Sequence, residues 1–236
     1  MLTIATFNIQ NDYGKDSSKN EQIIDFILSN KIDIIGIQEL FKSIGKSFEV
    51  RLEQENYKIM GKYRYKSPIL KKYNEKTPII TNKTVMEAKT YYLPFFPSFT
   101  RRILTKTVIN YNNKLLSIYN THLECKMIFV KKRQLDKILN IIKKDSNNIV
   151  LLGDFNLKTN KELFNNFVDE LKKLNIYRVS INEKTLKTSK YHRAIDHIFI
   201  SSDFEVIEKH VIKDINTSDH YPILVRLVEK KAVVYD

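Results

Sequence analysis

The sequence predicts a mixed α/β (α+β) fold of two stacked mixed β-sheets flanked by helices, that is, a four-layer αββα sandwich. Apolar and amphipathic stretches first alternate as strand, helix, strand and helix, and β-rich stretches with interspersed helices follow. This order differs from the regular strand–helix alternation of a doubly wound parallel sheet. The chain has only 5 Gly and 5 Pro and no linker-like segment. Residues 1–236 are therefore expected to form one domain.

The first half of the chain opens with alternating residues at 2–9, which predict a strand. Ser18-Lys19-Asn20-Glu21 is a capping box and predicts a helix whose buried side carries the apolar residues of 23–27. The short apolar run at 32–38 is typical of a strand buried on both faces. The elements expected next are a helix at 47–55 and strands near 57–61, 77–82, 102–110 and 114–121.

The second half carries a clear helical signal at 134–144, where Leu135, Ile138, Leu139 and Ile142 recur at helical spacing. The remaining elements are expected to be a strand at 149–152, a helix near 161–174, and strands at 195–201, 204–212 and 222–228. Residues 62–100 have the least regular pattern and mix Tyr and Phe with Lys and Pro. Long irregular segments of this kind are often functional loops.

Composition excludes several classes of protein. Hydrophobic residues make up 42% and charged residues 28% of the 236, which excludes a disordered chain. Cys125 is the only cysteine, so no disulfide can form within the chain, as suits a reducing compartment. The first residues do not resemble a signal peptide, and no run of about 18 apolar residues occurs. We expect a cytoplasmic monomer without a protein partner, although a secreted chain lacking its leader would look the same.

The strongly basic charge has two interpretations. With 40 basic and 27 acidic residues the net charge is +13, as expected of a protein that meets polyanions. However, the chain has 32 Lys against 8 Arg and is rich in Ile and Asn, a pattern typical of an AT-rich genome. The charge therefore indicates either an anionic substrate or an ordinary solvated basic surface.

Polar residues follow the apolar part of several predicted strands. In layered sheet folds, ligands and catalytic groups collect at such strand ends. The residues in question are Asn8, Gln38-Glu39, Asn120-Thr121-His122, Gly153-Asp154-Phe155-Asn156, Asp196 and Asp219-His220.

The oxygen-bearing members of this set suit a hard metal ion. Glu39, Asp154 and Asp219 provide carboxylates, and Asn8 and Asn156 provide amides. Such donors prefer Mg²⁺, Mn²⁺ or Ca²⁺ to zinc.

The nitrogen-bearing members suit phosphate chemistry. His122 and His220 can donate to a phosphate or move a proton near neutral pH. Asp196 can fix the tautomer of a neighbouring histidine and raise its pKa. A divalent ion, imidazoles and amide donors together are what attack of water on a phosphodiester requires.

Six short motifs follow one another between residues 6 and 222, nearly the whole chain. They are Thr6-Phe7-Asn8, Ile37-Gln38-Glu39, Asn120-Thr121-His122-Leu123, Gly153-Asp154-Phe155-Asn156, Ile195-Asp196-His197-Ile198 and Ser218-Asp219-His220-Tyr221-Pro222. In this order they resemble the endonuclease/exonuclease/phosphatase superfamily, which includes pancreatic-type deoxyribonucleases, abasic-site endonucleases, neutral sphingomyelinases and inositol-polyphosphate 5-phosphatases. The resemblance implies a phosphoester hydrolase that uses Mg²⁺, or Mn²⁺ or Ca²⁺ in its place.

The resemblance also implies roles for single residues. Glu39 would be the principal metal ligand, with Asn8 and Asp219 beside it. Asp154 would orient or deprotonate the attacking water, and Asn156 would hold a phosphate oxygen.

The remaining roles concern the two histidines. His220 would contact the scissile phosphate and pair with Asp196. His122 matches the second histidine of the deoxyribonuclease-like and sphingomyelinase-like branches, and Glu75 resembles the glutamate that orients it. Arg102 matches a phosphate-binding arginine, a role that the neighbouring Arg101 could fill instead.

Two positions depart from the pattern of the family. Lys131 stands where many relatives have an arginine, so a bidentate contact becomes a point charge. Gln10 replaces an acidic metal ligand found in some relatives, which weakens the case for a second tightly held ion.

Each site residue also has a structural interpretation when it is taken alone. Asn8 can simply end a strand, and Asp154 and Asn156 can cap the turn into the next helix. A single histidine is most often a hydrogen-bonded residue at the edge of a core. The joint arrangement of the motifs favours the catalytic interpretation.

Nucleic acid, and DNA in particular, is the expected substrate. His122 with Glu75 and the positive charge favour it, as do the basic residues Lys62, Arg64, Lys66, Lys71 and Lys72. The alternative is a phospholipid or inositol phosphate, because the aromatic run at 91–97 beside Lys and Arg could enter the head-group region of a membrane. A third class, a catalytically silent binding module, is disfavoured by the retained Glu39, Asp154 and His220.

Overall fold

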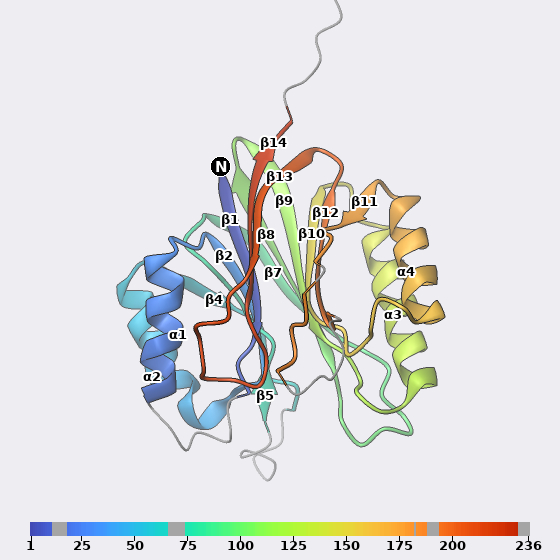
Figure 1. Ribbon diagram of the computed structural model, residues 1–236, viewed down its shortest axis with the longest axis horizontal. Coiled ribbons are helices and arrows are strands. Elements are labelled where there is room, and N and C mark those ends of the chain that lie inside the picture. Colours follow the sequence, from blue (N-terminus) through green and yellow to red (C-terminus); the bar gives the residue numbers. More distant parts are fainter. Residues whose placement is uncertain (11–17, 66–73, 182, 188–193, 231–236) are drawn as a thin grey trace, which may run out of the picture.

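The computed structural model describes residues 1–10, 18–65, 74–181, 183–187 and 194–230. Two six-stranded sheets stack face to face, and a pair of helices covers the outer face of each sheet (Figure 1). The pair on one side is α1 (Ser18–Ser29) and α2 (Lys42–Gln54), and the pair on the other side is α3 (Ile128–Ile142) and α4 (Glu162–Lys172). The expected four-layer αββα sandwich is confirmed.

The first sheet is built around a parallel pair of strands. β1 (Leu2–Asn8) pairs with β2 (Ile34–Gln38), and Asn8 lies opposite Gln38 where both strands end. α1 connects the two strands, since parallel neighbours need a crossover of this kind. The flanking strands are antiparallel to their neighbours and are β13 (Phe204–Val211) and β14 (Ile223–Glu229) on one side, and β6 (Ile79–Thr81) and β4 (Lys58–Met60) on the other.

The second sheet repeats this plan. β9 (Lys114–His122) and β10 (Asn148–Asp154) form the parallel pair, with α3 as the crossover, and His122 lies opposite Asp154. The flanking antiparallel strands are β12 (Asp196–Ser201) and β11 (Ile176–Arg178) on one side, and β8 (Ile103–Tyr111) and β7 (Val85–Tyr92) on the other. A separate short pair joins β3 (Leu40–Phe41) to β5 (Glu75–Lys76).

Three apolar clusters lie between the four layers. The cluster between the two sheets includes Ile4, Ile118 and Leu152, all fully buried. The outer clusters pack Phe48 of α2 against the first sheet and Phe164 of α4 against the second. Because burial of one such side chain contributes about 1.5–3 kcal/mol, these clusters hold the strand ends in fixed positions.

Gly36 lets the two sheets approach each other closely. A Cβ atom at this position would lie 1.9 Å from Cδ1 of Leu152 and 2.7 Å from Cγ of Asn120 on the opposite sheet. Any side chain here would therefore push the sheets apart.

The structure differs from the expected elements in several places. The short strands β3 and β5 were not expected, and α2 begins at Lys42, five residues before the expected start. β7 lies inside the segment that was expected to be irregular, and β11 was not expected at all. Most side chains of β7 are exposed or half-buried, so the strand lacks an apolar pattern that sequence could reveal. α3 begins at Ile128, six residues before the expected start. α1 begins at Ser18, although the Ser18 side chain of the expected capping box lies outside the described part.

In the described ranges, no helix is both long and apolar enough to cross a membrane.

Candidate active site

The predicted site residues meet at one end of the sandwich, the lower end in Figure 1. β1, β2, β9 and β10 run toward this end, and Asn8, Glu39, His122 and Asp154 stand at the last residue of these strands or directly after it. The loop between β13 and β14 adds Asp219 and His220, and β12 and the loop before β8 add Asp196 and Arg102. Parallel strands thus deliver their terminal polar groups to one place.

Unusual backbone conformations fix the directions of these groups. Glu39 and Asn156 have positive φ angles of 61° and 51°. Asparagine tolerates this region, whereas a glutamate in it is uncommon and is held there by its surroundings. Gly153 has φ 141°, and a Cβ there would lie 2.0 Å from the carbonyl oxygen of Thr121, so only glycine fits directly before Asp154.

Asn8 joins the two sheets at the centre of the site. Its Nδ2 donates to Oδ2 of Asp154 at 3.0 Å and lies 3.3 Å from Oε1 of Glu39. Its Oδ1 accepts the backbone N–H of Gln10 at 3.1 Å. One amide therefore bridges two acidic side chains that the sequence separates by more than a hundred residues.

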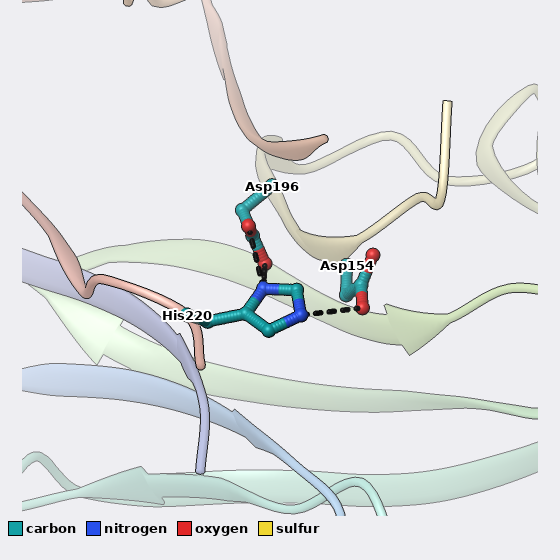
Figure 2. Close-up of side chains that lie close together, drawn as sticks. All are labelled: Asp154, Asp196 and His220. Atoms are coloured by element: carbon teal, nitrogen blue, oxygen red, sulfur yellow. Dashed lines mark hydrogen bonds and ion pairs between the residues drawn. The ribbon is translucent and has the colours of Figure 1, made fainter. Parts of the chain in front are cut away.

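His220 is held by Asp196 and faces Asp154 (Figure 2). Its Nδ1 lies 2.9 and 3.1 Å from the two carboxylate oxygens of Asp196, and its Nε2 lies 3.8 Å from Oδ2 of Asp154. Burial alone would lower the pKa of His220, but Asp196, Asp154 and Asp219 outweigh it and raise the pKa to about 10. The ring is thus an imidazolium at neutral pH.

Asp154 is fully buried and remains close to its titration range. Burial and the neighbouring Asp196 raise its pKa to about 6, against the opposing effects of His220 and Asn8. Its Oδ1 accepts the backbone N–H of Asn156 at 2.8 Å. Asp154 is mostly ionised at pH 7 and can still accept a proton.

His122 is neutral, and its tautomer follows from Arg102. Nη1 of Arg102 lies 2.9 Å from Nδ1 of His122, and a guanidinium can only donate, so Nδ1 accepts and Nε2 carries the proton. Nε2 lies 3.5 Å from Oδ2 of Asp154 and 3.9 Å from Oε1 of Glu39. Burial and the positive charge of Arg102 lower the pKa of His122 well below its usual value.

Glu75 acts on His122 through arginine. Oε1 of Glu75 accepts from Arg64 at 2.7 Å and lies 3.2 Å from Arg102, whereas His122 Nδ1 is 4.0 Å away. Glu75 was expected to orient His122, and the hydrogen bonds between them run through Arg102. Arg101 points elsewhere and lies over the rings of two aromatic residues, so Arg102 is the arginine that enters the site.

Asn156 and Asp219 lie at the rim of this cluster. Asn156 donates from Nδ2 to the carbonyl oxygen of Leu123 at 3.1 Å, and the buried Lys131 donates to the backbone carbonyl of Asn156 at 2.6 Å. Lys131 therefore stabilises the turn at Asn156 through its backbone carbonyl. Asp219 lies 4.0 Å from Nε2 of His220.

Three supporting residues were given no role within the site from the sequence, although Arg64 was named among the basic residues and Ser218 in the last motif. Arg64 is the first partner of Glu75. Ser218 donates to the carbonyl oxygen of Asn8 at 2.7 Å and accepts the N–H of His220. Thr185 Oγ1 accepts the N–H of Asp196, and its carbonyl accepts that of Tyr221. Ser218 was visible only as part of the last motif, and the sequence carries no signal for Thr185, because hydroxyl groups that hydrogen-bond to the backbone are common in proteins.

The family model described as Endonuclease/Exonuclease/phosphatase family matches residues 5–220. The chain belongs to the endonuclease/exonuclease/phosphatase family. The resemblance indicated by the six motifs is thus confirmed, and the chain is a phosphoester hydrolase of this family. No curated protein sequence matches the chain significantly.

Solved structures of the endonuclease/exonuclease/phosphatase family share the fold of this chain. A mannosyl-6-phosphatase from Bacteroides thetaiotaomicron VPI-5482 superposes with a TM-score of 0.80 at 20% identity, covering 97% of this chain and 100% of that one. The human Nocturnin catalytic domain with bound sulfate anion gives 0.79 at 16% identity, over 97% and 94%. TDP2 of D. rerio, complexed with single strand DNA product, gives 0.73 at 16% identity, over 96% and 98%.

Enzymes of the endonuclease/exonuclease/phosphatase family depend on a metal ion, and the residues present fit a divalent cation. Burial and the nearby Glu75 raise the pKa of Glu39 to about 7, which marks negative charge that the protein alone leaves uncompensated. Asp154, Asp196 and His220 also hold ligand atoms within 4.8 Å of one another, although Nδ1 of His220 already bonds Asp196. Oxygen donors of this kind suit Mg²⁺ or Mn²⁺.

Proposed function

We propose that this protein is a divalent-metal-dependent phosphodiesterase that hydrolyses nucleic acid, with DNA as its first substrate. One observation carries the proposal: two imidazoles in different charge states converge on one carboxylate. Nε2 of His220 and Nε2 of His122 lie 3.8 and 3.5 Å from the same oxygen of Asp154. A phosphoryl group in this space meets a cation, a neutral N–H donor and a base.

His220 acts as the positively charged donor. Asp196 holds the proton on Nδ1, so the Nε2–H points toward Asp154 and the proposed phosphate position. With a pKa of about 10, the imidazolium offsets negative charge that develops on the phosphoryl oxygens and can protonate a leaving oxygen.

Asp154 acts as the proton acceptor. Its pKa of about 6 is close enough to neutral pH for it to take a proton from water. Asn8 and the backbone N–H of Asn156 hold the carboxylate in position. His122 donates from Nε2 to a phosphate oxygen, and Arg102 supplies a second positive charge behind it.

The metal ion, when bound, supplies positive charge at the phosphoryl oxygens. Glu39 would hold it, with Asp219 beside it, and Asn156 would bind a phosphate oxygen. Asn8 would contribute as a ligand only through Oδ1, the atom that accepts the N–H of Gln10. Mg²⁺ is the proposed ion because the donors are oxygens, a preference that Mn²⁺ and Ca²⁺ share.

Charge supports nucleic acid as the substrate. The chain carries a net charge of +13, and Arg64 and Arg102 lie at the site itself. The structure of the TDP2 relative with single strand DNA product supports the same class of substrate. Of the other basic residues invoked above, Lys66, Lys71 and Lys72 lie outside the described residues.

The test compares the wild-type protein with His220→Ala on supercoiled plasmid and on the same DNA as denatured single strands, in Mg²⁺ or in EDTA. We expect cleavage of at least one DNA form that requires both the metal and His220. His210→Ala is the matched control, because His210 is an exposed histidine on β13. Cleavage that survives EDTA or His220→Ala would overturn the proposal.

A phospholipid or inositol phosphate is the second candidate substrate. The exposed Phe96 in the aromatic run beside the site favours it. Release of phosphate or phosphocholine from such substrates, with no cleavage of DNA or RNA, would move the assignment to this class. No turnover of any substrate by a folded, metal-bound protein would indicate a binding module.

A further inference from the structure

A group of exposed rings stands beside the candidate site. Phe99 is 96% exposed and Phe96 is 75% exposed, values at which a phenylalanine contributes nothing to a core. Tyr92 and Phe129 are also exposed, and Phe95 is half-buried. We call this group the aromatic rim, formed by Tyr92, Phe95, Phe96, Phe99 and Phe129. Exposed apolar groups gathered in this way mark interaction sites.

We propose that the aromatic rim binds unstacked bases next to the scissile phosphate, so that the enzyme acts on single-stranded nucleic acid in preference to continuous duplex. The inference rests on the proposed function and specifies its substrate.

The backbone that carries the rim is tied down on several sides. The carbonyl of Pro94 accepts from Gln134 of α3 at 2.9 Å, and the carbonyl of Phe96 accepts from Arg133 of the same helix. Ser98 donates to the buried Glu124 at 2.5 Å. These contacts join residues 94–98 to the first turns of α3, from which Phe129 projects. The rings are therefore presented by an ordered support, which lowers the entropic cost of binding.

The rim is continuous with the catalytic groups. Phe99 precedes Arg102 by three residues, so their Cα atoms lie within about 11 Å. The hydroxyl of Tyr65 donates to the carbonyl of Phe99 and accepts the N–H of Arg101. Glu124, which holds Ser98, follows His122 by two residues. A strand whose phosphate contacts Arg102 and His122 therefore has its neighbouring nucleotides at the rim.

The charges within the rim favour nucleic acid over a lipid surface. The guanidinium of Arg101 lies 5.1 Å from the ring centres of both Tyr92 and Phe95. A charge between two rings opposes insertion of this part into hydrocarbon. Alternating cations and aromatic faces suit a single strand, whose phosphates meet the cations while its bases stack on the rings. The exposed Lys126 adds positive charge in the loop before α3, whereas Lys132 of α3 pairs with Asp136.

Stacking on the rim requires bases that are free of their neighbours. In a continuous duplex each base face is covered by the adjacent base pairs, and exposing one costs several kcal/mol. Phosphate contacts alone would not favour single strands, since the duplex carries the higher density of backbone charge. The aromatic rim is thus the feature that separates single strands from duplex.

The test measures binding of fluorescein-labelled strands to His220→Ala protein in EDTA, so that no cleavage occurs. The strands are a single-stranded oligonucleotide, its duplex, and a single strand of equal length built from abasic sites. We expect Phe99→Ala to weaken binding of the base-bearing single strand about 5- to 100-fold and to leave the abasic strand unaffected. Tyr177→Ala is the control, because Tyr177 is an exposed aromatic residue on β11.

Two results would overturn the inference. One is equal binding of duplex and single strand with no effect of Phe99→Ala, and the other is an equal loss on abasic and base-bearing strands. Flotation with phosphatidylserine-containing vesicles that Phe99→Ala abolishes, with single-strand binding intact, would assign the rim to membranes instead. Cleavage in Mg²⁺ is measured separately. Cleavage without a preference for single strands would contradict the inference and leave the proposed function intact. Single-strand binding without any cleavage would contradict the proposed function and leave the inference intact.

Discussion

The side-chain amides of Gln38 and Asn120 join the two sheets across the interior: Nε2 of Gln38 donates to Oδ1 of Asn120 at 2.7 Å. Nδ2 of Asn120 in turn donates to the carbonyls of Ile37 and Pro78, at 2.9 and 2.7 Å. Both side chains are fully buried. Directly beyond Gln38 lies Glu39, and two residues beyond Asn120 lies His122, so this bond sets the distance between the two halves of the site.

Replacement of Asn120 by alanine should lower the free energy of unfolding by about 2–4 kcal/mol, because three hydrogen bonds between buried polar groups are lost and a cavity is left at the sheet interface. Urea unfolding in EDTA measures the loss. Asn110→Ala, at an exposed position of β8, should change stability by less than about 0.5 kcal/mol. Equal stability of the two variants would contradict the structural role of the amide pair.

The Asp196→Asn variant should lose about 10²- to 10⁴-fold in turnover while keeping its fold. Loss of the carboxylate charge next to Nδ1 lowers the pKa of His220, so the ring becomes neutral at a lower pH. The high-pH limb of the rate profile should therefore move to lower pH, and NMR titration of His220 should follow it. Asp203→Asn, at an exposed carboxylate that accepts from Asn148, is the control. An unchanged pKa of His220 in this variant would contradict the role given to Asp196.

Glu39→Gln should weaken binding of Mg²⁺ or Mn²⁺ at least about tenfold, measured by calorimetry or Mn²⁺ resonance. The same change should stabilise the metal-free protein above pH 7, because it removes a half-buried negative charge that burial and the neighbouring Glu75 disfavour. Glu162→Gln, in the first turn of α4, is the matched control. Wild-type metal affinity in Glu39→Gln would exclude Glu39 as a ligand.

His197 should make the protein sensitive to mild acid. Burial lowers its pKa from 6.5 to about 3, and its ring packs against Phe155, Phe164 and Phe199. Between pH 6.5 and about pH 3, His197 is protonated in the unfolded chain but neutral in the folded chain. The free energy of unfolding therefore falls as the pH falls, by up to about 1.4 kcal/mol per pH unit.

Urea unfolding at pH 7 and pH 5 in EDTA tests this prediction. His197→Phe should reduce the difference in stability between the two pH values, whereas His210→Phe, at an exposed histidine, should leave it unchanged. If His197→Phe keeps the wild-type pH dependence, other groups cause the acid sensitivity.

Much of the fold and of the site was predictable because buried strands end in polar residues. The runs before Asn8, Glu39 and Asp154 are apolar, so the strand ends were visible in the sequence. β7 escaped prediction because an exposed edge strand is stabilised by pairing with β8 and not by its own pattern. β11 has only three residues, too few for a period to emerge.

Contacts between distant residues were beyond the reach of sequence patterns. Nothing local distinguishes Arg101 from Arg102, and the choice follows from which of them faces Glu75 and His122. The relay of Glu75 through Arg102, and the hold of Arg64 on Glu75, depend on loops that meet only in the folded chain. For the same reason, the sequence predicted an aromatic segment but not that residues 94–98 are tied to α3.

The repeated plan of the two sheets makes this single chain comparable to a dimer with its active site at the subunit interface. One half brings Asn8, Glu39 and His220, and the other brings His122, Asp154 and Asp196, so neither half holds a complete reaction centre. A slip of about 1 Å between the halves would cost about 100-fold in rate, although each half could keep its strands and helices. Under gradual denaturation, catalysis should therefore fail before circular dichroism registers any loss of secondary structure.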